Sequence, residues 1–208
     1  MTDTSPRRSA TRQRIYRAAI PLFAEQGLTA TTVEQIAERA GVAKGTVYYN
    51  FAGKTELFEA LLRDGVEPLT FALRRSAALA PGGAMAALEG MAGAGIAFVA
   101  AQPDLARLLV TEQWRGSRAG HPMLAAARRR VAGVVEEVLE EGVKAGELRA
   151  DLDVRLISGA LVGMVVLGAL DWQMFHPERR QDEVRRALAT VLRGRLGAVD
   201  ERDAGGGR

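Results

Sequence analysis

Residues 32–51 read TVEQIAERAGVAKGTVYYNF, two short segments with apolar inner faces on either side of a glycine. Thr32 followed by Gln35 fits a capping box, which starts a helix. Gly41 ends that helix, because glycine turns the chain without a Cβ clash. A second short helix is expected over about residues 44–50. Two short helices joined by a tight turn predict a helix-turn-helix.

The second of these helices is expected to keep polar and aromatic side chains on its outer face. Val42 and Val47 are expected to fill the space between the two helices. The outer face has hydrogen-bond donors, aromatic rings and one glycine for close approach, which suits insertion into the major groove of DNA. The expected exposed residues are Lys44, Gly45, Thr46, Tyr48, Tyr49 and Asn50.

Outward from this stretch the chain reads as helix after helix, without the alternation that predicts strands. We therefore expect an all-α protein with about nine helices. A helix over residues 9–26 ends at Gly27. A later helix begins at Lys54 and is ended or interrupted near Gly65 and Pro68. Further breaks are expected at prolines and glycines along the remaining chain.

Composition narrows the classes of protein that remain. The 208 residues include 0 Cys and 2 His, which excludes disulfides and thiol catalysis and argues against a histidine metal site. We expect no metal, no cofactor and no catalytic residue. The longest uncharged run, residues 156–170, has 15 residues, fewer than the ~18–20 needed to span a bilayer. With no visible signal peptide, a cytoplasmic protein without membrane contact is expected.

The net charge of +3 lies wholly at one end of the chain. Residues 1–58 hold eight Lys and Arg against five Asp and Glu, and the remainder is neutral. A basic end on a neutral body suggests contact with a polyanion. A solvated terminus with no partner is the alternative.

The helix-turn-helix and its flanks together resemble the TetR family of one-component transcriptional regulators. The resemblance covers about residues 9–69. It is carried by Arg14-Ile15, Ala18-Ala19, Leu22-Phe23, Gly27, Thr31-Thr32, Ile36-Ala37, Ala40-Gly41-Val42, Lys44-Gly45-Thr46-Val47-Tyr48, Phe51 and Lys54.

This resemblance implies roles that the residue chemistry allows. Thr32, Tyr48 and Lys54 correspond to contacts with backbone phosphates. Lys44, Thr46, Tyr49 and Asn50 would face bases or the adjacent phosphates, with Lys44 suited to guanine and Asn50 to adenine. The family more often has His or Tyr where Asn50 stands, so base preference at that position is open.

The arginines before the helix-turn-helix, Arg7, Arg8, Arg12 and Arg14, are expected to enter the minor groove or to neutralise phosphates. A solubilising tail is the alternative. The expected organisation is a DNA-binding domain over residues 9–69, with the helix-turn-helix at 32–51, and a ligand-binding and dimerisation domain over 70–196. We expect disorder in residues 1–8 and 197–208.

The second domain is expected, by resemblance, to hold a pocket for a small apolar or amphipathic effector. Such Met and aromatic residues also occur as plain core. The candidate lining residues are Met85, Met91, Phe98, Leu105, Leu109, Trp114 and Met123. Arg128-Arg129-Arg130 would either hold an anionic group or form a solvated helix face.

In the TetR family the last two long helices form a four-helix bundle with those of a second subunit. Residues 156–170 are apolar nearly all round and are expected to be buried on several sides. Packing within one chain is the alternative. The expected interface residues are Leu156, Ala160, Gly163, Leu167, Val184, Leu188, Val191 and Leu192.

The resulting hypothesis is a homodimeric repressor of double-stranded DNA that binds a palindromic operator and is released by its effector. The chain offers no paired carboxylate–histidine arrangement, phosphate loop or thiol, so we do not expect an enzyme. The alternatives that remain are an activator, or a ligand-binding helical protein that does not read an operator.

Overall fold

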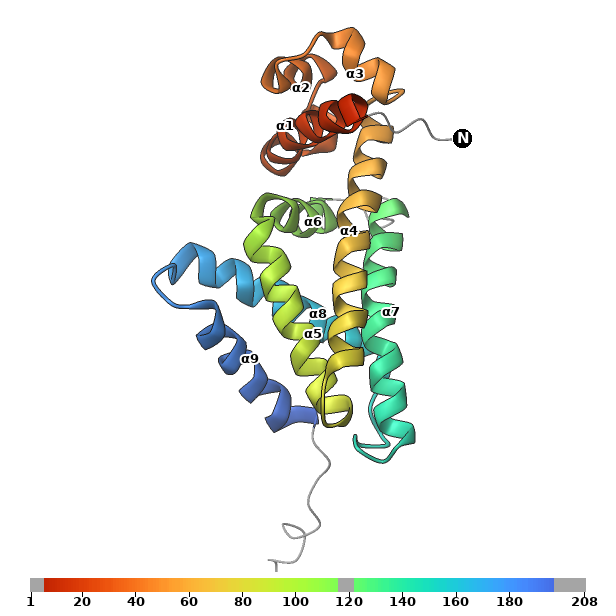
Figure 1. Ribbon diagram of the computed structural model, residues 1–208, viewed down its shortest axis with the longest axis vertical. Helices are drawn as coiled ribbons and strands as arrows, with labels where there is room; N and C mark the ends of the chain where they lie inside the picture. The colour runs from red at the N-terminus through yellow and green to blue at the C-terminus, as the bar shows by residue number, and fades with distance from the viewer. Residues whose placement is uncertain (1–5, 116–121, 197–208) are drawn as a thin grey trace, which may run out of the picture. The chain divides into compact units, whose positions relative to one another are not determined.

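The computed structural model describes residues 6–115 and 122–196. Within these ranges the chain forms nine helices and no strand (Figure 1), so the all-α prediction is confirmed. The helices are α1 (Pro6–Ala30), α2 (Val33–Ala40), α3 (Lys44–Asn50), α4 (Lys54–Leu79), α5 (Gly83–Ala101), α6 (Pro103–Arg115), α7 (Pro122–Lys144), α8 (Val154–Phe175) and α9 (Gln181–Leu196).

The chain divides into two compact units. The first unit comprises residues 1–66 and 102–127, and the second unit comprises residues 67–101 and 128–208. The sequence suggested a single boundary after residue 69, so the grouping of α6 with the N-terminal helices was not expected.

Packing explains why α6 belongs to the first unit. α6 packs on α1, and its Leu105 and Leu108 are buried. Gly65 of α4 makes room for α6, since a Cβ at this position would lie 2.7 Å from the Cδ2 atom of Leu105. A contact this short would force the Leu105 side chain or one of the two helices to move.

The first helix starts earlier than its sequence suggested. α1 begins at Pro6, so residues 6–8 are helical where disorder was expected; residues 1–5 and 197–208 lie outside the described ranges. Proline suits the start of a helix because the N–H that it lacks has no helical partner there. Gly27, with φ 85° and ψ 160°, interrupts the helix where the sequence predicts.

The core of the first unit forms where the apolar face of α1 meets α2 and α4. Ile15 and Phe23 of α1 are fully buried, as are Ile36 of α2 and Phe58 of α4. The rings of Phe23 and Phe58 meet edge to face, with centroids 5.6 Å apart. Aromatic pairs prefer this geometry, and it fixes α1 against α4.

α4 is longer than the sequence suggested. It continues through Gly65 and Pro68 to Leu79, so the prediction that these residues end or interrupt it is wrong. Proline inside a helix costs about 3 kcal/mol. Burial of Val66, Leu69 and Leu73 along the same helix offsets this cost.

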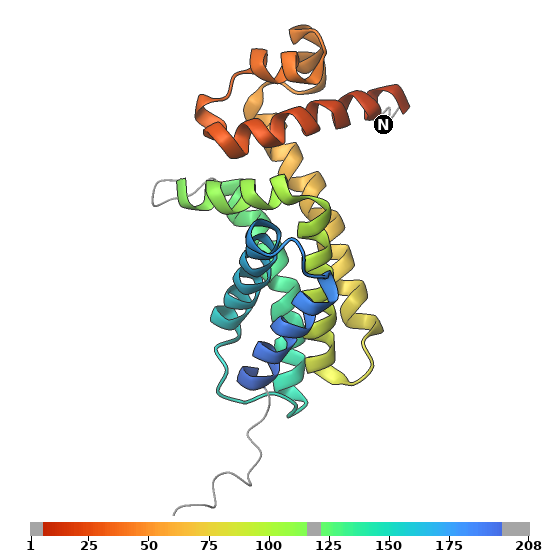
Figure 2. The same ribbon diagram turned by 90° about the vertical axis from the view of Figure 1, so that its left-hand side faces the viewer.

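In the second unit, α5 packs on both α8 and α9 (Figure 2). Small residues let these helices approach closely, because a Cβ at Gly95 would lie 2.7 Å from the Cγ1 atom of Val165 on α8. Arg193 of α9 donates two hydrogen bonds to Glu89 of α5. α5 is therefore the central helix of this packing.

Both α5 and α8 are long and apolar enough to cross a membrane by length and composition alone. α5 is a core helix, with 44% of its most apolar window buried. For α8 the buried share is only 17%, so the expectation that this segment is buried on several sides is wrong for the single chain. Leu156, Leu167 and Phe175 of α8 are exposed.

Candidate nucleic-acid interface

Hydrogen bonds at both ends of α2 form the helix-turn-helix. The N–H of Thr32 donates to the Oε1 atom of Gln35 at 2.8 Å, and the N–H of Gln35 donates to the Oγ1 atom of Thr32 at 3.2 Å. The predicted capping box is therefore confirmed. At the other end, Gly41 adopts a left-handed φ of 62°, and its N–H donates back to the carbonyl of Glu38.

Arg14 holds the end of α2 from the neighbouring helix α1. Its Nη2 atom donates to the carbonyls of Ala40 and Gly41 at 2.8 and 2.9 Å. These carbonyls lie at the negative end of the α2 dipole, where a cation is favoured. The sequence suggested that Arg14 belongs to an arm that contacts DNA, but the structure gives this guanidinium an internal role.

α3 presents an exposed face that carries most of the predicted DNA-reading residues. Tyr48 is 48% exposed and Tyr49 is 75% exposed, and the Lys44 side chain is also exposed. Gly45 has no atom within 4 Å of where a Cβ would stand, so its backbone is open to close approach. Thr46 is half-buried.

Two cations lie over the tyrosine rings of this face. The Nζ atom of Lys44 is 5.8 Å from the Tyr48 ring centroid, and the Cζ atom of Arg8 is 5.6 Å from that of Tyr49. Both distances suit a cation–π interaction. The face of α3 therefore combines positive charge with aromatic rings.

Lys44 also forms an ion pair with Glu34 of α2. The hydrogen bond between them lowers the pKa of the Glu34 carboxyl and raises the pKa of the Lys44 ammonium. Both side chains are exposed, and exposed pairs of this kind open at little cost. Lys44 can therefore exchange the carboxylate for another anion or acceptor.

Asn50 does not belong to the exposed face, so the prediction that its side chain is exposed there to face bases is wrong. It is 7% exposed, and its Nδ2 atom donates to the carbonyl of Thr46 at 2.8 Å. Asn50 lies three residues after the buried Val47, which puts both on the inner side of α3. Its side chain closes the last turn of the helix.

Two further predicted DNA contacts have internal partners. Lys54 donates to the carbonyls of Thr29 and Thr31 at 2.6 and 3.0 Å, so it holds the segment that enters α2. Its ammonium has a third N–H. Arg12 is half-buried among α1, α3 and α4. The side chain of Arg7 lies outside the described residues.

The sequence did not reveal the structural partners of these cations. Asp64 of α4 and Tyr16 of α1 both contact Arg12. Arg12 and Tyr16 are four residues apart on one helix, a spacing at which side chains meet, so this pair had a detectable signal. The contact with Asp64 had none, because it joins residues far apart in the chain.

The predicted effector-pocket residues fall into both units. Leu105 and Met91 are buried, and Met85, Phe98, Leu109 and Met123 are half-buried. The side chain of Trp114 lies outside the described residues.

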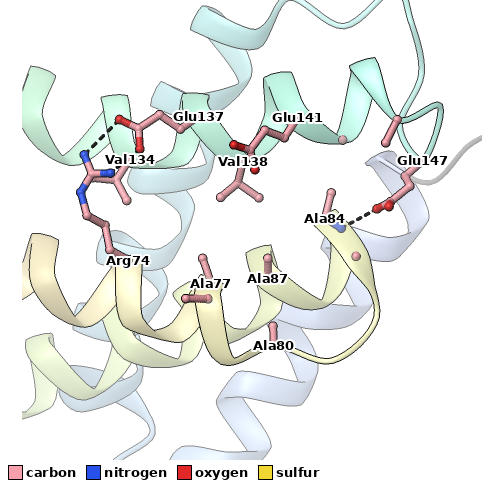
Figure 3. A pocket seen from close by; sticks show the side chains of 14 residues that line it. Arg74, Ala77, Ala80, Ala84, Ala87, Val134, Glu137, Val138, Glu141 and Glu147 are labelled. Carbon is pink, nitrogen blue, oxygen red and sulfur yellow. Dashed lines mark hydrogen bonds and ion pairs between the residues drawn. The ribbon is translucent and has the colours of Figure 1, made fainter.

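The second unit contains a groove that none of these residues lines (Figure 3). It has a volume of about 450 Å³ and lies among the C-terminal part of α4, the start of α5 and the end of α7. Small apolar side chains such as Ala77 and Val138 line it together with Glu137, Glu141 and Glu147. Arg74 also lines the groove, so the lining carries charges of both signs.

Two of the groove carboxylates already have partners within the chain. Glu137 binds the guanidinium of Arg74, and this bond lowers the pKa of the Glu137 carboxyl. Glu147 accepts the N–H of Ala84 at 2.6 Å. These bonds join α7 and the loop after it to α4 and α5.

The predicted dimer residues separate into two groups. Leu156, Ala160, Leu167 and Val191 are exposed, and Gly163 has open space around its Cβ position. Val184 and Leu188 are half-buried, and the Cδ2 atom of Leu188 lies 3.4 Å from where a Cβ of Gly168 in the same chain would stand.

Leu192 is 2% exposed, so its prediction as an interface residue is wrong. It belongs to the core of the second unit. The sequence missed Met174 and Phe175, which are 57% and 64% exposed. They follow Leu167 by seven and eight residues, the spacing of one helical face.

A helix-turn-helix with an exposed cationic and aromatic face, carried on an all-helical chain, defines a DNA-binding transcriptional regulator. Residues 15–61 match the family model described as bacterial regulatory proteins, tetR family. Residues 81–194 match the one described as tetracyclin repressor-like, C-terminal domain. The chain belongs to the TetR family of transcriptional regulators, which are not enzymes.

Relatives with assigned names support this classification. The chain is 31% identical over 186 residues to the HTH-type transcriptional repressor KstR2 of Mycobacterium tuberculosis, covering 88% of this chain and 92% of the repressor. It is 29% identical over 164 residues to the HTH-type transcriptional regulator SrpR of Pseudomonas putida, covering 78% and 75%.

Solved structures share the fold. The ketosteroid transcriptional regulator KstR2 of M. tuberculosis superposes with a TM-score of 0.70 at 26% identity, covering 95% of this chain and 98% of that one. The regulator FadR of Bacillus subtilis, solved in complex with stearoyl-CoA, has a TM-score of 0.74 at 22% identity, covering 86% and 96%.

Proposed function

We propose that the protein is a homodimeric repressor that binds a palindromic operator and leaves it when a small apolar or amphipathic effector binds the second unit. The observation that carries the proposal is the exposed face of α3, where Lys44, Tyr48 and Tyr49 surround the open backbone of Gly45. A regulator of this kind acts on DNA in the cytoplasm.

In this proposal the residues divide between phosphate and base contacts. Thr32 and Tyr48 contact backbone phosphates, and Lys54 uses its remaining N–H for the same purpose. Lys44, Thr46 and Tyr49 face base edges or the adjacent phosphates. The arginines at the start of α1 that remain candidates for DNA contact are Arg7 and Arg8.

Dimerisation is supported by the exposed apolar residues of α8. Leu156 is 70% exposed and Leu167 is 54% exposed. Apolar surface of this kind marks an interaction site, and a second copy of the same helix offers a matching surface. Twofold symmetry would set two α3 helices about one DNA turn apart.

The effector class draws support from the relatives. FadR of Bacillus subtilis was solved with stearoyl-CoA, an amphipathic molecule. α4 contributes residues to both units, so it is the route by which effector binding would change DNA affinity. A coupling of about 1–3 kcal/mol would release the operator 5- to 150-fold.

Selection of bound sequences from a random DNA pool at physiological salt tests the proposal. An enriched palindrome is the expected result. Weak, salt-sensitive binding without enrichment would contradict it and favour a ligand-binding protein that does not read an operator. Placing the enriched site before and within a reporter promoter then separates repression from activation.

A further inference from the structure

One guanidinium joins three helices of the first unit. The Nη1 atom of Arg12 on α1 donates to the backbone carbonyl of Asn50 at 3.3 Å. Its Cζ atom lies 4.4 Å from the ring centroid of Phe51. Asn50 is the last residue of α3 and Phe51 is its C-cap, so Arg12 holds the C-terminal end of the predicted recognition helix.

The same guanidinium is held from the other side by α1 and α4. Its Nη2 atom donates to the hydroxyl of Tyr16 at 2.9 Å, and that hydroxyl donates to the Oδ2 atom of Asp64 at 2.7 Å. Arg12 and Asp64 also form an ion pair at 3.7 Å. We call Arg12, Tyr16 and Asp64 the Arg12 clamp.

Tyr16 and Arg12 are the sheltered members of the clamp, which strengthens the hydrogen bond between them, whereas the Asp64 side chain is 42% exposed. The Arg12 side chain is 27% exposed, and Tyr16 is 6% exposed. Burial raises the pKa of Tyr16 to about 12, and the hydrogen bond to Asp64 adds to this rise. Tyr16 therefore stays protonated at physiological pH and remains a donor to Asp64.

The clamp contacts the C-terminal end of α3, at the Asn50 carbonyl and the Phe51 ring, and not the outer face of the helix. Its acceptor on α3 is a main-chain carbonyl at the negative end of the helix dipole, where a cation is favoured. The fixed planar fork of arginine reaches this carbonyl and the Tyr16 hydroxyl at once, which a lysine cannot do in the same geometry. Arg12 thus sets where the end of α3 lies relative to α1 and α4.

We propose that Arg12, held by Tyr16 and Asp64, is a positioning residue that gives the regulator its sequence discrimination by fixing α3, and that it is not a phosphate contact. This inference rests on the proposed DNA-binding function. Base readout needs contact groups held within about 0.5 Å of the productive geometry, whereas phosphate contacts carry no sequence information. Loss of the clamp therefore lowers operator affinity and leaves non-specific affinity in place.

The test compares Arg12→Gln and Arg12→Lys with Arg17→Gln, which removes the same charge from an exposed position on α1. Affinities for the selected operator and for a random duplex are measured over a range of salt concentrations. We expect Arg12→Gln to weaken operator binding at least about tenfold, the loss of one well-made base contact. Random-duplex affinity and the salt slope stay unchanged, and Arg12→Lys does not restore discrimination.

Asp64→Asn supplies a test with the opposite electrostatic sign. Removing a carboxylate favours DNA binding if charge alone matters, so weaker operator binding by Asp64→Asn supports positioning. Glu67→Gln, which removes an exposed carboxylate from the same helix, is its matched control. If Arg12→Gln does not fold, Asp64→Asn and Tyr16→Phe carry the same comparison with losses of about threefold.

Four results would overturn the inference or the proposed function on which it rests. A parallel fall of both affinities in Arg12→Gln, with a salt slope lower by about one, would make Arg12 a phosphate contact. A lower melting temperature with unchanged discrimination would make the clamp purely structural. A wild-type protein that discriminates no sequence would overturn the proposed function itself, whereas a discriminating wild type matched by its clamp variants overturns this inference alone.

Discussion

The helix-turn-helix and α8 differ in whether their exposed groups have partners within the chain. Around the helix-turn-helix, cationic side chains from neighbouring helices satisfy the carbonyls at the helix ends, as Arg14 does for Ala40 and Gly41. Along α8, apolar side chains such as Leu156 and Leu167 stay exposed. Within the described residues, these two side chains are 70% and 54% exposed.

This difference indicates which region needs a second copy of the chain to bury its surface. The carbonyls at the ends of α2 and α3 find hydrogen-bond partners inside the first unit, so the placement of these two helices does not require a second copy. α8 lacks the buried area that its composition demands, because a helix that is apolar nearly all round needs neighbours on several sides.

The largest effect is expected from a charge placed on α8. Leu167→Glu would bury a carboxylate in the proposed dimer, where an unpaired charge costs several kcal/mol. We expect the dimer to dissociate at least about 100-fold more readily, as measured by sedimentation.

The control for this charge is Phe71→Glu. Phe71 is 69% exposed, but it lies on α4 rather than α8, and its replacement should leave the dimer intact. A monomeric wild type, or equal sensitivity at both positions, would contradict the contrast between the two regions.

A smaller effect is expected from Tyr16→Phe at alkaline pH. The pKa of Tyr16 is raised from 10.0 to about 12, so between these values the unfolded chain loses the proton first and native stability falls as pH rises. The loss is at most about 3 kcal/mol, complete above pH 12 and absent below pH 10.

Urea unfolding from pH 9 to 11.5 measures this loss. The wild type should lose stability relative to Tyr16→Phe as pH rises, whereas Tyr48→Phe should follow the wild type. Parallel curves for the wild type and Tyr16→Phe would mean that the hydroxyl is not held as described.

Gly41→Ala tests the turn of the helix-turn-helix. The left-handed φ of 62° at this position costs a residue with a Cβ about 1–2 kcal/mol. The added methyl group would also lie 3.2 Å from the Nη2 atom of Arg14. Chemical denaturation should show this loss, and an unchanged midpoint would argue against the turn geometry.

Gly45→Ala has the smallest expected effect on stability, and its sign is opposite. The helical Gly45 has open space at its Cβ position, so alanine should stabilise the fold by about 0.5–1 kcal/mol. Operator affinity should nevertheless fall, because the methyl group would stand between α3 and the DNA. Greater stability with unchanged affinity would remove Gly45 from the interface.

Local signals in the sequence predicted most of the fold. The capping box at Thr32 and the break at Gly41 both depend on residues close in the chain. The extension of α4 through Pro68 was missed because distant packing, rather than local propensity, decides whether a helix tolerates proline.

The candidate site was predicted less completely. Residue type identified the exposed Lys44, Tyr48 and Tyr49. It could not separate cations that face solvent from cations that bind backbone carbonyls of the same unit. Arg12 binds the carbonyl of Asn50, 38 residues later in the chain, and Arg14 binds that of Ala40, 26 residues later. Asn50 lies on the inner side because it follows the buried Val47 by three residues in a helix. The prediction considered the suitability of asparagine for adenine and overlooked this spacing.

The continuity of α4 has a mechanical consequence. Proline has no N–H, so Pro68 cannot donate a helical hydrogen bond to the carbonyl of Asp64, four residues earlier. A helix bends most cheaply where such a bond is missing. A bend of α4 at this missing bond would fall on the same turn whose carboxylate contacts Arg12, and it would displace the end of α3 that Arg12 holds.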